Sequence, residues 1–348
     1  MIKPASSHRS SMLIVQYAFF TLLLSLAFSA FVFADEDREM ETILVIGKRP
    51  GPALWKVSHG ENVLYIFGYL PLVPKGIDWD SARVKGILEK AQEFIGGPNE
   101  GVFFPIPQEQ RNNPDGKKLK DVLPSDTNDR FEVFLKENFR HDRAIERLRP
   151  IFASSSLANS IFRQHGLIRA NKILKKIDKL ANRNRKLKRA QLAFERPEDL
   201  IVNLQQEVIK MVAELTPERE VSCFEAAINR MMEDIDLLKQ RANAWAEGDV
   251  SKLTFLEDDL RKHKSSCPFH FLGSRANLSN LADHINPEVF AEYETAKNQY
   301  MEHWLSIVDN ALASNETSFA VLNISQLLGD GGVLDKLRER GYAVKEPL

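Results

Sequence analysis

The stretch LYIFGYLPLVPKG, residues 64–76, has the layout of a strand end that presents a catalytic side chain. An apolar run closes on Gly68 and passes through Tyr69 and Leu70 into the proline-rich segment PLVPKG. Ligands of α/β proteins bind outside the carboxyl ends of strands, so a side chain in the stretch Gly68–Pro71 could act on a substrate. Proline offers no ligand atom, because its ring nitrogen is part of the peptide bond. The rest of the segment favours a rigid turn.

The second group that could do chemistry is the pair Cys223 and Cys267, the two cysteines of the chain. An even pair in an exported protein predicts a disulfide. The alternative is a metal site in HKSSCPFH, made of His263, Cys267 and His270. Its spacing matches no standard zinc pattern and a fourth ligand is not evident, so the sequence favours the disulfide.

The remaining histidines and the serine cluster form no recognisable site. Ser154, Ser155 and Ser156 are not surrounded by the G-x-S-x-G pattern of a nucleophile elbow. No two of the other histidines have the i, i+4 spacing of a helix-borne zinc motif. These histidines are His59, His141, His165, His284 and His303.

The N-terminus predicts export. Lys3 and Arg9 precede the apolar run Met12–Phe33, and the small residues of VFA stand before the acidic DEDRE. This is the layout of a secretory signal peptide cleaved after Ala34. The alternative is an uncleaved membrane anchor, since the run is about long enough to span a bilayer. We expect residues 1–34 to be the signal peptide and residues 35–50 a linker.

The composition is that of a globular protein, with 43% apolar and 27% charged residues. The net charge of the whole chain is −1, and removing residues 1–34 takes away basic residues but no acidic ones. A negative mature chain argues against nucleic acid as the main partner.

The two ends of the chain follow one plan. Near the N-terminus, Ala53–Ser58 and Val63–Tyr69 predict a hairpin around HGEN, followed by a helix over residues 79–92 and a short strand in EFIGGPN. Near the C-terminus, a strand over Phe319–Ile324 is followed by the loop SQLLGDGG, a helix over Val333–Arg340 and a strand in YAVKE. Each end is therefore a strand-loop-helix-strand unit.

Such units favour crossover connections between parallel strands. We predict an α/β fold in which the two units form a central sheet, with the loops after Tyr69 and Ile324 side by side. Residues 97–125 predict an ordered loop, and residues 126–312 predict a long, mostly helical insertion. Residues 51–348 are expected to form a single domain.

One helical segment is strongly basic. Residues Arg169–Arg189 carry ten Lys or Arg and one Asp, with an apolar stripe of Ile173, Ile177, Leu180 and Leu187. They predict a basic amphipathic helix with two interpretations: the stripe docks and the basic face is solvated, or the helix makes a weak contact with an anionic membrane.

Several of these motifs resemble the TraB/GumN family, the group that also contains the TIKI Wnt-cleaving proteases. The first resembling stretch is LWKVS at Leu54–Ser58, then Gly68–Pro71 with Pro74, Gly76 and Trp79. The second is Asn323–Leu328, then Gly332, Leu334, Leu337, Gly341, Tyr342 and Val344; LRPIF at Leu148–Phe152 is similar to the middle region of the family. The resemblance covers most of the chain beyond residue 34.

The resemblance also implies where a site should be. In metal-dependent members, the histidines of two G-x-x-H motifs are thought to hold a divalent metal with the help of acidic residues. This sequence has Pro71 at the first histidine position, Gln326 at the second, and Asn323 in place of the second glycine. Glutamine is a weak ligand compared with imidazole, and GGPN at residues 96–99 lacks the expected acid. The resemblance therefore implies a degenerate site at Gly68, Pro71, Asn323 and Gln326, with no metal and no cofactor.

Together these features predict an exported, periplasmic pseudoenzyme with a binding or accessory role toward an unknown protein or small-molecule ligand. The alternative is a divalent-metal-dependent hydrolase or protease with non-standard ligands, such as Gln326 with Glu214, Glu218 or Glu225.

The cysteine pair gives a first test. Thiol counting on the unreduced, unfolded protein should find no free thiol, because export exposes Cys223 and Cys267 to oxidation. The same protein after reduction is the control and should give two. Two reactive thiols without reduction would contradict the disulfide and weaken the expectation of export.

Overall fold

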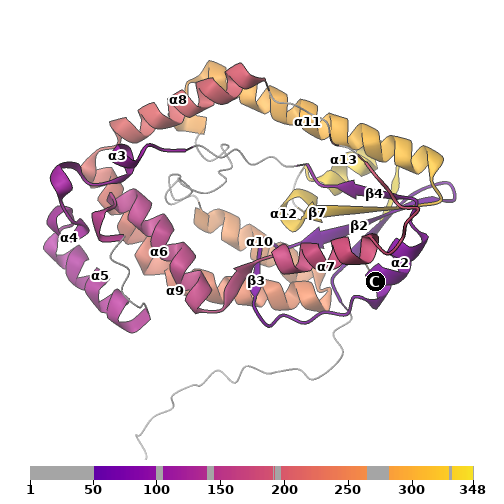
Figure 1. The fold of residues 1–348 in the computed structure, drawn as a ribbon, viewed down its shortest axis with the longest axis horizontal. Helices are drawn as coiled ribbons and strands as arrows, with labels where there is room; N and C mark the ends of the chain where they lie inside the picture. The colour runs from indigo at the N-terminus through magenta and orange to yellow at the C-terminus, as the bar shows by residue number, and fades with distance from the viewer. Residues whose placement is uncertain are drawn as a thin grey trace, which may run out of the picture. The chain divides into compact units, whose positions relative to one another are not determined.

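The structure, a computed structural model, describes residues 51–98, 105–138, 145–190, 192, 197–264, 282–328 and 331–347 (Figure 1). All of them belong to one compact unit, Lys48–Leu348. The expected signal peptide and linker lie outside the described residues, as do Cys267 and His270. The signal peptide, the disulfide and the alternative metal site therefore stay predictions.

A six-stranded sheet organises the described residues, in the order β6-β4-β7-β2-β1-β8. β7 pairs in parallel with β2 on one side and with β4 on the other, and β4 pairs in parallel with β6. β1 runs antiparallel to both β2 and β8, so β8 points the same way as β2. The strands are β1 (Leu54–His59), β2 (Asn62–Tyr69), β4 (Glu93–Gly96), β6 (Lys188–Arg189), β7 (Thr317–Asn323) and β8 (Ala343–Lys345).

This sheet confirms the predicted fold class. The first unit runs β2, α2 (Ala82–Lys90), β4, and the second runs β7, α13 (Val333–Glu339), β8. In both units the two strands are parallel and belong to the same sheet. The centre of β7 is a run of buried apolar side chains, Phe319 to Leu322, as expected for a strand that is covered on both faces.

Helices cover both faces of the sheet. α11 (Pro287–Ser314) packs on β1, β2, β4 and β7, whereas α2 contacts β7 and packs against α7 (Asn171–Ala181). Figure 1 shows the sheet between α11 and the pair α2 and α7. The core between these layers contains the fully buried side chains of Trp55, Phe67, Trp245 and Trp304.

The middle of the chain is mostly helical, as predicted. It contains α5 (Ser125–Asn138), α6 (Pro150–Gln164), α8 (Glu198–Glu214), α9 (Pro217–Glu247) and α10 (Val250–Lys264). α9 has 31 residues, so it is roughly 45 Å long at 1.5 Å per residue. Its earlier turns bury Phe224 and Ile228 in a helical core, and its last turn buries Trp245 in the core of the sheet. One helix thus joins both cores.

Two predictions of irregular structure are wrong. Residues 97–125 contain α3 (Gln108–Arg111), the 3-10 turn η1 (Pro114–Gly116) and α4 (Leu119–Val122) rather than only a loop. α4 forms because Leu119 is buried and the Asp121 carboxylate accepts a hydrogen bond from the Lys118 N–H at 2.9 Å. Short helices held by tertiary packing are hard to detect in a sequence rich in Pro, Asn and Gly.

The segment after Pro71 is also more regular than predicted. Within PLVPKG, β3 (Leu72–Pro74) pairs antiparallel with β5 (Leu167–Arg169) in a separate two-stranded sheet. Proline is tolerated there because a strand with one neighbour leaves one edge unpaired.

The basic segment also differs from its prediction: only Asn171–Ala181 is helical, and Lys188–Arg189 forms β6. None of the helices described by the structure combines the length and apolar character needed to cross a membrane.

A polar cluster fastens the C-terminal unit. The Tyr342 hydroxyl donates a hydrogen bond to Asp309 Oδ1 at 2.8 Å, and Arg340 forms ion pairs with Asp309 and Glu302. Burial, and then the hydrogen bond to Asp309, raises the pKa of Tyr342 from 10.0 to about 12.

We expect Tyr342 to ionise in a separate step at high pH. Its folded-state pKa lies above the ordinary value, so its contribution to stability is complete below pH 10 and is lost as the pH rises through about 12. Ultraviolet difference titration should show a tyrosine phase near pH 12 that Tyr342→Phe removes. Asp309→Asn should move this phase to lower pH, and a phase that survives Tyr342→Phe would disprove the assignment.

Candidate functional site

The carboxyl ends of β2, β7 and β4 meet at one edge of the sheet. The register pairs Tyr69 with Asn323 and Gly96 with Val321, so the loops that follow these strands begin side by side. Ligands bind at such an edge in α/β sheets. The four predicted site residues all follow or end these strands, and we call them the strand-end site: Gly68, Pro71, Asn323 and Gln326.

Gly68 is required by close packing. A Cβ at this position would lie 2.4 Å from Ile324 Cδ1 and 2.9 Å from Leu327 Cδ1, both in α12 (Ile324–Leu327). Its carbonyl oxygen accepts a hydrogen bond from Trp245 Nε1 at 2.7 Å. The glycine therefore lets α12 lie directly against β2, and α9 closes the strand end through Trp245.

Pro71 lies two residues beyond β2 and is exposed. Its carbonyl oxygen accepts a hydrogen bond from the Ala170 N–H at 3.0 Å, immediately before α7. Together with the pairing of β3 and β5, this bond ties the loop to the helical middle. Pro71 contributes a backbone contact to the site and no side-chain ligand.

Asn323 and Gln326 form a reciprocal cap at the start of α12. The Asn323 side chain accepts a hydrogen bond from the Ser325 N–H at 3.2 Å, and the Gln326 amide oxygen accepts one from the Asn323 N–H at 3.3 Å. The Gln326 amide nitrogen then donates to the Pro98 carbonyl at 3.0 Å, in the segment that follows β4. Gln326 thus bridges the loops after β7 and β4.

These residues are poorly suited to hold the divalent metal that the resemblance implies for active members. The oxygen of the Gln326 amide already accepts one hydrogen bond, and its nitrogen is a donor to Pro98. Pro71 has no side-chain lone pair. Among the residues that the structure describes, no group of three or more His, Cys, Asp or Glu side chains is arranged to hold a metal ion.

The acidic residues considered as alternative ligands lie elsewhere. Glu225 precedes Trp245 by twenty residues in the same helix, which places it roughly 30 Å along α9 from the contact with Gly68. There it pairs with Arg130 at 2.9 Å. Glu218 is in the first turn of α9 and Glu214 ends α8, so both are at that distant end as well.

Two features near the strand ends were missed in the sequence. Trp304 Nε1 of α11 donates to the Gly96 carbonyl at 2.7 Å, in the same way that Trp245 donates to Gly68. Arg241 and Glu257 form a buried ion pair between α9 and α10, with side chains 6% and 5% exposed. Arg241 is one helical turn before Trp245. Nothing local in the sequence marks these residues, because each contact joins distant segments.

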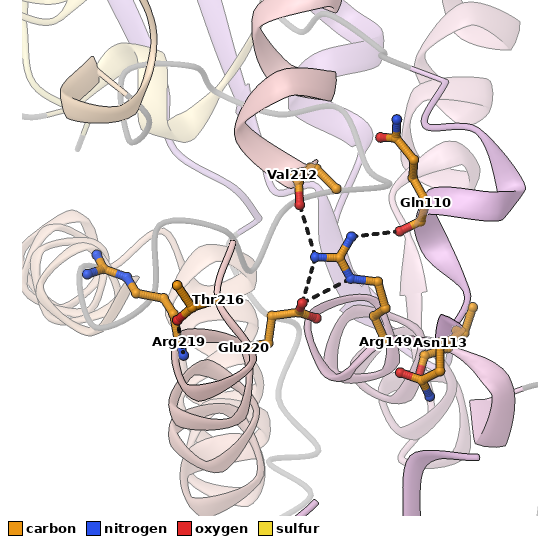
Figure 2. Close-up of polar contacts among 8 residues, drawn as sticks. Gln110, Asn113, Arg149, Val212, Thr216, Arg219 and Glu220 are labelled. Carbon is orange, nitrogen blue, oxygen red and sulfur yellow. Dashed lines mark hydrogen bonds and ion pairs between the residues drawn. The ribbon is translucent and has the colours of Figure 1, made fainter. Parts of the chain in front are cut away.

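A further buried polar cluster surrounds Arg149, in the stretch LRPIF. Figure 2 shows its guanidinium between three elements. Nε and Nη2 donate to Glu220 Oε1 at 2.9 and 2.6 Å, Nη1 donates to the Gln110 carbonyl at 3.0 Å, and Nη2 also donates to the Val212 carbonyl at 2.9 Å. The Arg149 and Glu220 side chains are 14% and 7% exposed. Arg149, immediately before α6, therefore fastens α3, the end of α8 and the start of α9 together.

The sequence model of the TraB/PrgY/gumN family matches residues 53–346. The chain belongs to this family, as the resemblance of its end motifs implied. Comparisons with curated proteins and with solved structures found no match. The matched range includes the strand-end site and the Arg149 cluster.

Removing Arg149 should destabilise the protein strongly. Arg149→Met leaves the Glu220 carboxylate buried without its cation and should lower the free energy of unfolding by about 3 kcal/mol, measured by urea denaturation. Adding Glu220→Leu should recover part of this loss, because no buried charge then remains unpaired.

Arg163→Met is the matched control. Arg163 is an exposed arginine of α6, the helix that begins directly after Arg149, so its loss should change stability by less than about 0.5 kcal/mol. Equal stabilities for Arg149→Met and Arg163→Met would show that the Arg149 cluster does not hold the helices together.

Proposed function

We propose that the chain is an exported, non-catalytic member of the TraB/PrgY/gumN family that binds or assists another molecule. The observation that carries this proposal is the bridge made by Gln326. Its side-chain amide accepts a hydrogen bond from the Asn323 N–H and donates one to the Pro98 carbonyl. The residue at a predicted ligand position therefore connects two loops. Metal-dependent hydrolysis needs ligands and a positioned general base, and the strand-end site offers neither in its side chains.

Export rests on the sequence of residues 1–34 and on the cysteine pair. Cys223 is buried at 6% exposure, and its disulfide with Cys267 is part of this proposal. A disulfide of this kind would form in the periplasm or outside the cell and not in a reducing cytosol. We therefore propose a periplasmic location with cleavage after Ala34.

The ligand class that fits this proposal is a protein or a small molecule at the strand-end edge. The edge keeps the position at which α/β sheets bind ligands. The carbonyls of Gly68, Gly96 and Pro98 there already accept hydrogen bonds from Trp245, Trp304 and Gln326, so a ligand would contact other groups of these loops.

The alternative is a metal-dependent hydrolase with non-standard ligands, and one observation bears on it. Glu257 is a buried carboxylate connected to the strand end through Arg241 and α9. Its ion pair with Arg241 opposes a role as a ligand, because the guanidinium already neutralises its charge.

The two functions differ in metal binding. The purified wild-type protein should hold no stoichiometric divalent ion after dialysis, measured by elemental analysis. Pro71→His with Gln326→His should raise the affinity for Zn²⁺ at least about tenfold in calorimetry, because imidazole binds such ions far better than an amide oxygen. Hydrolysis need not return, since the second shell and the general base are also missing.

The two single substitutions are the controls. Each places one imidazole at the edge and should bind Zn²⁺ much more weakly than the double variant, because one ligand does not make a site. Circular dichroism checks that loss of the Gln326 cap leaves the fold intact. A double variant that binds Zn²⁺ no more tightly than the single variants would contradict the expectation that residues 71 and 326 lie close enough to bind one ion. A stoichiometric metal in the wild-type protein would contradict the non-catalytic role.

A further inference from the structure

The strongest charged feature outside the strand-end site is the surface of the basic segment. All ten of its Lys and Arg residues are exposed, and we call them the basic face. They are Arg169, Lys172, Lys175, Lys176, Lys179, Arg183, Arg185, Lys186, Lys188 and Arg189. The only acidic residue within the segment is Asp178.

The fold places the four lysines of α7 and Arg189 close together. On α7 the lysines follow a three- and four-residue spacing from Lys172 to Lys179, which places them on one side of the helix. The chain then turns back, and Arg189 pairs with Asp178 at 3.2 Å. Asn184 Nδ2 fixes the turn by donating to the carbonyls of Leu88 and Ala91 at 3.0 and 2.8 Å. The residues after α7 are thereby held beside the helix.

Most of these cations have no counter-charge within the described residues. Arg189 is in the single ion pair, and its guanidinium also lies over the Phe94 ring. Lys176 lies over the Trp79 ring at 4.5 Å. The other eight make no ion pair among the residues that the structure describes. Such a density of like charge is unfavourable by itself and is relieved by a multivalent anionic partner.

The neighbouring apolar groups indicate which anionic partner fits. Ile173, Ile177 and Leu180 are buried in the core, so the stripe is not available to enter a bilayer. Trp79 and Phe94 are also buried, at 5% and 8% exposure, so neither ring that the cations contact is open for a base to stack on. Six of the ten cations are lysines, which act as point charges, and only the four arginines have the planar fork that reads a defined carboxylate or phosphate. These properties suit a surface of diffuse negative charge.

We propose that the basic face docks the protein on a bilayer that contains anionic phospholipids, by electrostatic attraction without insertion. The docked surface has a fixed relation to the sheet: the Ala170 N–H, which directly follows Arg169, bonds to the Pro71 carbonyl, and β6 pairs with β4. Docking would therefore also set the orientation of the strand-end site relative to the membrane. The inference does not depend on whether that site is catalytic.

Vesicle sedimentation tests this directly. The wild-type protein should bind vesicles of phosphatidylcholine with phosphatidylglycerol at low salt and not vesicles of phosphatidylcholine alone. Binding should be lost at high salt, since exposed charges are screened over about 10 Å at 0.1 M and about 3 Å at 1 M. Each lysine near an anionic surface changes binding by roughly fivefold, so replacing Lys172, Lys175, Lys179 and Lys186 by Gln should lower the partition by more than about a hundredfold.

Two matched variants complete the experiment. Replacing Lys117, Lys120, Lys136 and Lys252 by Gln removes the same charge from exposed positions outside the basic face and should leave binding near the wild-type level. Replacing the four basic-face lysines by Arg keeps the charge and should preserve binding. Thermal unfolding by circular dichroism checks that each variant is folded.

Three results would overturn the proposal. They are no binding of the wild type to anionic vesicles at low salt, equal losses in the two glutamine variants, and binding to dextran sulfate without binding to vesicles. The last result would assign the face to a soluble polyanion.

Discussion

The parallel pairing of β2 with β7 is the contact on which the rest of the fold depends. β7 is the link between the β2-β1-β8 strands and the β4-β6 strands, and without it the sheet would fall into two ribbons. The pair joins a strand near the start of the described residues to one near their end. The helical middle is therefore an insertion between strands of one sheet. Its register also decides which loops meet at the strand-end site, because Tyr69 and Asn323 are neighbours.

The residues at and beyond the end of this strand pair have different structural roles. Gly68 is needed for packing, since a side chain there would collide with Ile324 and Leu327 whatever the protein does. Pro71, Asn323 and Gln326 stand at positions where the resemblance implies other residues. Gln326 has a structural role of its own: its side chain caps α12 and donates a hydrogen bond to the Pro98 carbonyl.

The sequence was sufficient for the elements whose burial follows a simple period. β2 and β7 are recognisable because apolar residues fill them, and α13 because Leu334 and Leu337 point inward. It was insufficient where the deciding partner is distant. β3 exists because it pairs with β5, and the roles of Trp245, Trp304 and Arg149 depend on carbonyls and carboxylates in other segments. The basic segment shows both cases. Ile173, Ile177 and Leu180 of its stripe are buried as predicted, whereas Leu187 lies beyond α7 and the last two residues pair with β4 as β6.

The central place of β7 has a consequence for the order of events during synthesis. Translation produces the neighbours of this strand, β2 and β4, long before Thr317–Asn323 leaves the ribosome. Until then both strands have an open edge in the middle of the future sheet, while the β1–β2 hairpin and the helices of the middle can already complete their local contacts. Such a sheet, closed by contacts between remote segments, forms late and slowly compared with helices. The sheet thus lacks its final topology until Thr317–Asn323 has been made.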